Sequence, residues 1–195
     1  MPRPRTAVAF AAALALAGAA AAHSGSDTHK VNGSIHVGSG EHAGDLTTVS
    51  GSIHVADGAE AGRARTVNGD IEVGAHASVG ALQTVNGGIA VGADAKVATT
   101  VGTVNGDIRL EHGADVVGRA STVNGSIRLE AAHVGGGLAT VEGDVTIGAD
   151  SRVEGGLLVE KPTRSSSGEE HKPRIVVGPR AVVDGTLEFR REVEL

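Results

Sequence analysis

The chain of 195 residues contains no cysteine, tryptophan or tyrosine, and it has only two phenylalanines and one methionine. Without cysteine the chain forms no disulfide bond and carries no lipid-modified cysteine anchor. The scarcity of aromatic rings removes the stacking surfaces on which single-stranded nucleic acid binds. It also argues against an ordinary globular core, so we expect an interior lined by small aliphatic side chains.

Basic residues are also in the minority, with 17 Lys and Arg against 23 Asp and Glu and a formal net charge of −6. An acidic surface of this kind repels phosphate backbones and anionic lipid headgroups. The composition therefore predicts a protein without a nucleic-acid partner.

Residues 1–22 differ in composition from the rest of the chain. Arg3 and Arg5 precede an apolar run from Ala7 to Ala17, and small residues follow as far as Ala22. This order is typical of a secretory signal peptide cleaved before His23, with a structural helix as the alternative. The run is too short and too rich in alanine to favour a membrane span. We therefore expect a periplasmic or secreted mature protein with a lead-in at residues 23–30 and no membrane span after cleavage.

Glycine is abundant, with 30 residues, and much of it belongs to a recurring phrase of the form TVNG[S/D/G]I. The phrase returns every 18 or 19 positions. Its valines are Val31, Val49, Val67, Val85, Val104, Val123 and Val141. A fixed short period is the signature of a solenoid, in which each repeat buries its apolar face against its neighbours.

One coil, numbered from its valine as position 0, shows the alternation of a strand. Val67, Gly69, Ile71 and Val73 occupy positions 0, 2, 4 and 6, which we expect to face inward, with Thr at −1, Asn at 1 and Ser or Asp at 3 facing solvent. Glycine at position 2 permits a corner or a close backbone approach. Further apolar residues recur at positions 12 and 15, namely Val79, Val97, Val153, Leu46, Leu82 and Leu138.

These positions divide the coil into three short faces. The sequence therefore predicts an all-β, single-stranded parallel β-solenoid of about eight coils with a triangular cross-section, spanning residues 31–195. Asn-Gly between apolar residues is also a hairpin signal, so an antiparallel meander is the alternative. Near-constant repeat length favours the solenoid, because a meander needs a second turn signal in each repeat.

The repeat continues across an interruption. Residues 147–159 align without a gap onto residues 177–189, which is one coil plus an insertion of 12 residues. The insertion lies in a polar loop at residues 160–173. We expect the last coil to be incomplete, with Phe189, Val193 and Leu195 forming an exposed C-terminal coil through which the chain self-associates.

Repetition turns sequence positions into rows along the solenoid axis. We expect the threonine and asparagine rows to be structural ladders bonded along the axis, formed by Thr66, Thr84, Thr103, Thr122, Asn68, Asn86, Asn105 and Asn124. At position 3 no two aspartates are neighbours, which spaces their charges and argues against a paired-carboxylate active site.

Position 5 carries His36, His54 and Glu72 in successive coils. The outer two would lie about 10 Å apart in a straight row, too far for three ligands of one ion at about 2.1 Å. We therefore expect no metal site and no cofactor. Weak chelation by His36 with His54 is the alternative to simple surface histidines.

The insertion holds the remaining polar candidates for a binding site, which are Lys161, Arg164, Glu169, Glu170, His171 and Arg174. The composition of this segment is that of a solvated loop, and loops also carry many binding sites. Its ligand is left open, and no catalytic residue is predicted.

The TVNGSI and TVNGDI phrases, followed by a polar and an apolar residue, resemble the adhesin-like repeat domains of bacterial envelope proteins over residues 31–195. The segment IVVGPRAVVDGTLE, from Ile175 to Glu188, is similar to bactofilins, which are polymer-forming β-helical proteins that are typically cytoplasmic. Both resemblances imply a scaffold without catalytic residues. VGADAK at Val91 and VGPRAV at Val177 also resemble the hexapeptide helices of acyltransferases, for which His171 is the one histidine nominated by position.

Together these observations predict a non-enzymatic, secreted or periplasmic β-solenoid with a structural, adhesin-like or self-associating role in the bacterial cell envelope. A cell-envelope component or a surface glycan is the expected partner beside a second copy. The alternative is a carbohydrate-active or acyl-transferring β-helix enzyme, which would need a cleft built by insertions on one face.

Overall fold

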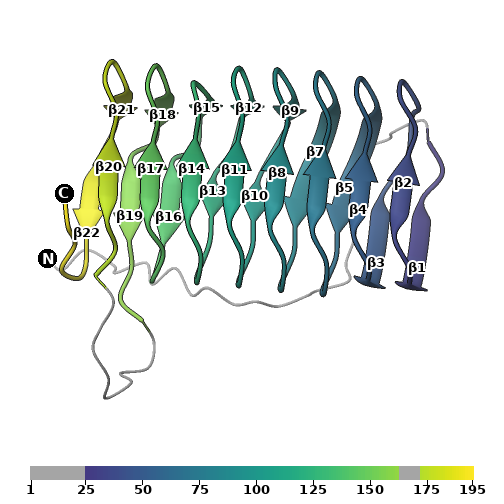
Figure 1. Cartoon of the computed structure of the whole chain (residues 1–195), viewed down its shortest axis with the longest axis horizontal. Coiled ribbons are helices and arrows are strands. Elements are labelled where there is room, and N and C mark those ends of the chain that lie inside the picture. Colours follow the sequence, from purple (N-terminus) through teal and green to yellow (C-terminus); the bar gives the residue numbers. More distant parts are fainter. Residues whose placement is uncertain (1–24, 163–171) are drawn as a thin grey trace, which may run out of the picture.

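The computed structural model describes residues 25–162 and 172–195. Within these ranges the chain is all-β, without a helix, and its strands stack in parallel along one axis. The expected β-solenoid is therefore confirmed, and the parallel pairing excludes the antiparallel meander. Figure 1 shows the coils in a row, from β1 and β2 at the purple end to β22 at the yellow end.

The first face of the solenoid is an eight-stranded parallel sheet with one strand from each coil. Its eight strands delimit seven complete turns. They are β2 (Ile35–Val37), β4 (Ile53–Val55), β6 (Ile71–Val73), β8 (Ile89–Val91), β11 (Ile108–Leu110), β14 (Ile127–Leu129), β17 (Val145–Ile147) and β20 (Ile175–Val177).

Two further faces belong to one branched 14-stranded sheet. The second face contains β9 (Lys96–Val97), β12 (Asp115–Val116), β15 (His133–Val134), β18 (Arg152–Glu154) and β21 (Val182–Asp184). The third face contains β1 (Thr28–Asn32), β3 (Leu46–Ser50), β10 (Val101–Gly102), β13 (Ala120–Ser121), β16 (Leu138–Thr140), β19 (Leu157–Val159) and β22 (Leu187–Phe189). The longer strands β5 (Glu60–Arg65) and β7 (Ser78–Gln83) span both, which joins the two faces into one sheet.

The core is a thin column of aliphatic side chains between the three faces. Positions 4 and 6 point inward as predicted, and Ile71 and Val73 are buried. The residues at positions 12 and 15 are buried as well, from Val79 on the second face to Leu82 on the third. Because each coil contributes the same few positions, small aliphatic residues fill the interior without large rings.

The prediction for positions −1 and 0 is wrong. The threonines at −1 are buried, including Thr66 and Thr122, whereas the valines at 0 are exposed at Val31 and Val49 and half-buried at Val67, and among the valines of the recurring phrase only Val141 is buried as predicted. The reason is the corner at the following glycine: the chain changes direction between positions −1 and 4. The inward and outward alternation of side chains along the first face therefore does not extend to the residues before the corner, where it predicts the wrong side of the sheet.

The corner glycine behaves as expected. Gly33 adopts a φ of +105°, in the region that favours glycine. A Cβ atom added at Gly69 would lie only 2.5 Å from the carbonyl carbon of Gly51 in the preceding coil. The glycines thus stack backbone against backbone, which a side chain at this position would prevent.

Strand pairing across the insertion follows the predicted alignment. Ile147 pairs with Val177, Val153 with Val183, and Val159 with Phe189. At the other end β1 begins at Thr28, inside the residues assigned to a lead-in. The predicted signal peptide at residues 1–22 lies outside the described residues.

Candidate functional site

The residues proposed from the insertion do not form a described cluster. Arg164, Glu169, Glu170 and His171 lie outside the described residues, so only the two flanking side chains can be placed. Lys161 is exposed after β19. Arg174 lies just before β20, where its backbone N–H donates to the Asp144 carboxylate at 2.8 Å. What the structure shows of Arg174 is therefore a structural contact between coils.

The asparagine ladder is present as predicted. The side-chain amide of Asn86 donates to that of Asn68, Asn105 donates to Asn86, and Asn124 donates to Asn105, each at 2.9 Å. All three bonds point the same way along the axis. Each side-chain amide in the middle of the row donates one N–H to one neighbour and accepts a hydrogen bond from the other. The ladder therefore connects neighbouring coils.

The threonine row has a different role from the predicted one. Thr84 does not bond to the threonine of the next coil; its hydroxyl donates to the carbonyl of Gly69, in the preceding coil, at 3.0 Å. The same bond recurs at Thr66, Thr103 and Thr122. Each hydroxyl therefore satisfies a carbonyl at the corner, where the backbone ladder is interrupted.

The Ser or Asp at position 3 accepts backbone N–H groups at the same corner, where the threonine hydroxyls pair the carbonyls. The N–H of Gly88 donates to the Asp70 carboxylate at 2.7 Å, and the N–H of Ser126 donates to Asp107 at 2.6 Å. Ser52 accepts the N–H of Asp70 in the same way, at 3.3 Å. Ser and Asp both place an oxygen within reach of this N–H, which explains why either residue occurs at position 3.

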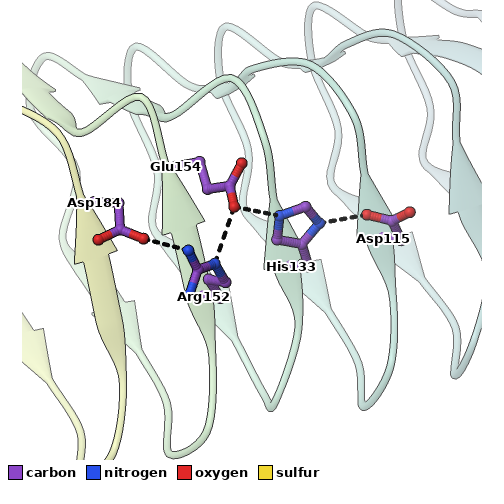
Figure 2. Close-up of polar contacts among 5 residues, drawn as sticks. All are labelled: Asp115, His133, Arg152, Glu154 and Asp184. Carbon is purple, nitrogen blue, oxygen red and sulfur yellow. Dashed lines mark hydrogen bonds and ion pairs between the residues drawn. The ribbon is translucent and has the colours of Figure 1, made fainter.

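The second face carries a chain of charged contacts that the sequence interpretation missed. His133 Nδ1 lies 2.6 Å from Asp115 Oδ1, and its Nε2 lies 3.8 Å from Glu154 Oε1. Arg152 in turn contacts two carboxylates: its Nε lies 2.9 Å from Glu154 Oε1, and its Nη2 lies 2.5 Å from Asp184 Oδ2. Figure 2 shows these five side chains following one another across neighbouring coils.

Within this cluster Arg152 and Glu154 stabilise each other's charged forms. The hydrogen bond from Arg152 lowers the pKa of Glu154, and Glu154 with Asp184 raises the pKa of Arg152. Both ring nitrogens of His133 face carboxylates. Neither nitrogen therefore faces a hydroxyl group that the ring could activate as a nucleophile. Within the described residues the role of this cluster is therefore structural: its contacts connect neighbouring coils. Aligning the coils in register would have shown Asp115 beside His133.

Similar ion pairs hold the last coil against its neighbour. Arg180 contacts Asp150 at 2.6 Å, Arg190 contacts Glu160 at 2.8 Å, and Lys172 contacts Glu192 at 2.8 Å. The hydrogen bond from Arg180 lowers the pKa of Asp150, and the one from Lys172 lowers the pKa of Glu192. The coils on both sides of the insertion are thus joined by charge as well as by strand pairing.

The outward surface of the first face divides into two halves. Towards the N-terminal end it carries His36, His54 and Glu72, and further along it carries the adjacent Arg109 and Arg128. Between them the small residues Gly88 and Ala90 leave a shallow hollow of about 260 Å³. No group of three or more metal-ligating side chains is found within the described residues.

The C-terminal end of the solenoid exposes positions that are buried elsewhere. Val177 continues the inward row of Val37 and Ile147, yet it is 53% exposed, whereas Val37 is 4% exposed. Leu187 continues the row of Leu157 and is also 53% exposed. Phe189 and Val193, expected at the exposed end, are instead partly buried against the core, while Leu195 is exposed.

Comparisons with protein-family models, with curated proteins and with solved structures gave no match to this chain. In the part of the chain that the structure describes, no helix is long and apolar enough to cross a membrane.

Proposed function

We propose that the chain is a non-enzymatic β-solenoid of the bacterial cell envelope, periplasmic or secreted, which acts as a structural element by associating with a second copy through its C-terminal end. The observation that carries the proposal is the exposed end of the core at Val177 and Leu187. Support for the compartment comes from the signal-peptide pattern of residues 1–22 and from the resemblance to adhesin-like repeats.

At the end of the stack, β21 and β22 have no described strand on their outer side, whereas β20 is covered at its start, where the N–H of Ile175 donates to the carbonyl of Glu194 at 2.7 Å. β20 is the last strand of the first face, and β21 and β22 are the last strands of the other two. Unpaired strand edges are templates for pairing with another chain. The apolar rows that run beneath them add a hydrophobic contribution to such pairing.

A second copy of this chain matches that end better than an unrelated surface. A partner must offer strands to three faces at once, at a spacing of about 4.8 Å, and aliphatic rows in the same places between them. A solenoid end has this arrangement. The envelope role follows, because a rigid rod that joins to its own kind builds an extended structure.

The test is sedimentation velocity of the tag-free chain over a range of concentrations, compared with V177K/L187K. We expect the wild type to form larger species as concentration rises and the double variant to remain a monomer, because two buried charges at the joint are costly. Val117 is 59% exposed but lies just after β12 on the flank. V117K is therefore the matched control and should associate like the wild type.

Circular dichroism establishes that the variants keep their β structure. A wild-type chain that stays monomeric at every concentration would contradict the proposal. So would a V117K variant that dissociates as completely as V177K/L187K, because association would then depend on the flank.

A further inference from the structure

The first two coils place two histidine rings side by side on the outer surface of the first face. His36 in β2 and His54 in β4 are paired in register, so both side chains leave the sheet on the same side. Their ring centres are 5.8 Å apart, and the ring planes are tilted by 52°. His36 is exposed and His54 is half-buried, so an ion in solution can reach both rings.

The separation of the rings fits two ligands of one metal ion. At a metal–nitrogen distance of about 2.1 Å, two imidazoles on a tetrahedral ion have their ring centres roughly 5 Å apart. A small rotation of the exposed His36 side chain closes the remaining difference. The strands themselves need not move, because neighbouring parallel strands already stand about 4.8 Å apart.

Glu72 supplies the support that metal-binding histidines usually have. Its Oε2 atom lies 3.2 Å from Nδ1 of His54, one coil further along the same row. An ionised carboxylate only accepts hydrogen bonds, so in the neutral ring this contact places the proton on Nδ1 and leaves the lone pair on Nε2. A carboxylate in this position fixes the tautomer and the orientation of a ligating ring.

The other described histidines with acidic neighbours lack the second ring. His42 lies 2.9 Å from Glu60, His76 lies 3.9 Å from Asp94, and His133 faces Asp115 at 2.6 Å and Glu154 at 3.8 Å, so these rings contact carboxylates and no second imidazole. Among the described residues, the one ring-to-ring contact is that between His36 and His54. The combination of two adjacent rings and an orienting carboxylate is therefore specific to this place.

From this geometry we propose that His36 and His54 form a two-histidine site for a divalent transition-metal ion such as Cu²⁺, Ni²⁺ or Zn²⁺. These are the ions that imidazole ligands favour. Water completes the coordination, and Glu72 acts as a positioning residue outside the coordination shell. The site needs two ligands from neighbouring coils, so the row need not supply a third.

The test is titration of the tag-free chain with CuCl₂, followed by calorimetry and by electron paramagnetic resonance of the bound ion. We expect one site whose spectrum shows coupling to two nitrogens. H36A and H54A should each lose one nitrogen from the spectrum and at least tenfold in affinity. H42A removes a histidine that also contacts a carboxylate, and this control should bind like the wild type.

Glu72→Gln tests the positioning role separately. We expect about tenfold weaker binding, with the two-nitrogen spectrum retained and with recovery in Glu72→Asp. Copper binding by H36A equal to that of the wild type would overturn the site, as would an equal loss in H42A. Unchanged affinity in Glu72→Gln would overturn the role of Glu72 alone.

Discussion

The Thr103 hydroxyl donates to the Gly87 carbonyl at 2.9 Å, across the corner that joins the third face to the first. Beside it, Asn105 donates to Asn86, and Asp107 accepts the N–H of Ser126. Each polar residue of the phrase TVNG[S/D]I thus satisfies a group at the corner, where regular strand pairing is interrupted. Buried polar groups are costly when unpaired, which gives every repeat the same requirement.

Replacing Thr103 by Val tests this role at the scale of one residue. The change keeps the shape of the side chain but leaves the Gly87 carbonyl without its hydroxyl donor. We expect the free energy of unfolding to fall by about 1–3 kcal/mol, the cost of an unsatisfied buried group. Urea denaturation measures it.

Thr146→Val is the control for that substitution, because Thr146 points outward from the middle of β17. A β-branched residue of the same shape suits a strand, so stability should hardly change. An equal loss in both variants would show that the hydroxyl at the corner has no special role.

At the scale of the coil, the stacked glycines set how closely neighbouring corners approach. Gly106 lies over Gly87, and an added Cβ atom would stand 2.5 Å from the Gly87 carbonyl carbon and 3.0 Å from the Gly88 nitrogen. Both atoms belong to the backbone, so neither can swing aside as a flexible side chain would. The coil spacing at this corner therefore requires glycine.

Gly106→Ala should accordingly be strongly destabilising, by about 3 kcal/mol, because the two coils must separate locally. Gly102→Ala, four residues earlier in the same coil, is the matched control. A Cβ atom there meets its nearest neighbour, the Ser121 hydroxyl, at 3.6 Å, which is ordinary contact. Thermal unfolding of both variants measures the difference. Equal midpoints would contradict the close approach at the corner.

Much of the coil was predictable from the sequence because its cause is local and repeated. The period, the inward residues Ile71 and Val73, and the pairing of Ile147 with Val177 all follow from aliphatic residues at fixed spacing. The burial of Thr66 was predicted wrongly because alternation does not continue through a corner.

The charged chain on the second face was not predictable in full. Asp115 and His133 occupy equivalent positions in neighbouring coils, which an alignment of the repeats reveals. Glu154, in contrast, contacts both Arg152 and His133, which depends on the direction that its flexible side chain takes. Side-chain orientation of this kind is not recorded in a repeat pattern.

At the scale of the whole molecule, the two ends of the stack differ in how the core is closed. Val37 in the first strand of the first face is buried, whereas Val177 in the last strand is exposed. The last coil relies on ion pairs such as Arg180 with Asp150 for part of its attachment. We therefore expect the C-terminal coil to be the least stable part of the isolated solenoid and the most sensitive to acid.

The direction of that pH effect follows from the depressed pKa values of Asp150, Glu154 and Glu192. A carboxyl whose folded pKa is lowered stabilises the fold above its ordinary pKa of about 4, and this contribution is lost as the pH falls through the folded value. Between pH 5 and pH 2, amide protection in β20 to β22 should fall more than in β6 to β11.

Hydrogen exchange expressed as protection factors, which correct for intrinsic pH dependence, measures this difference. Asp150→Asn at pH 7 should reproduce part of the loss, because it removes the charge that faces Arg180. A uniform fall in protection along the stack would contradict the role of these pairs at the C-terminal coil.

The central claim is that the repeats build a rod and that its exposed C-terminal end joins it to a second copy. Electron microscopy of the purified, tag-free chain tests this claim most directly. Eight strands at about 4.8 Å give a rod of roughly 40 Å. The account predicts end-to-end pairs about twice that length, and single rods in V177K/L187K. Single rods of the wild type at every concentration, or particles joined along their flanks, would contradict it.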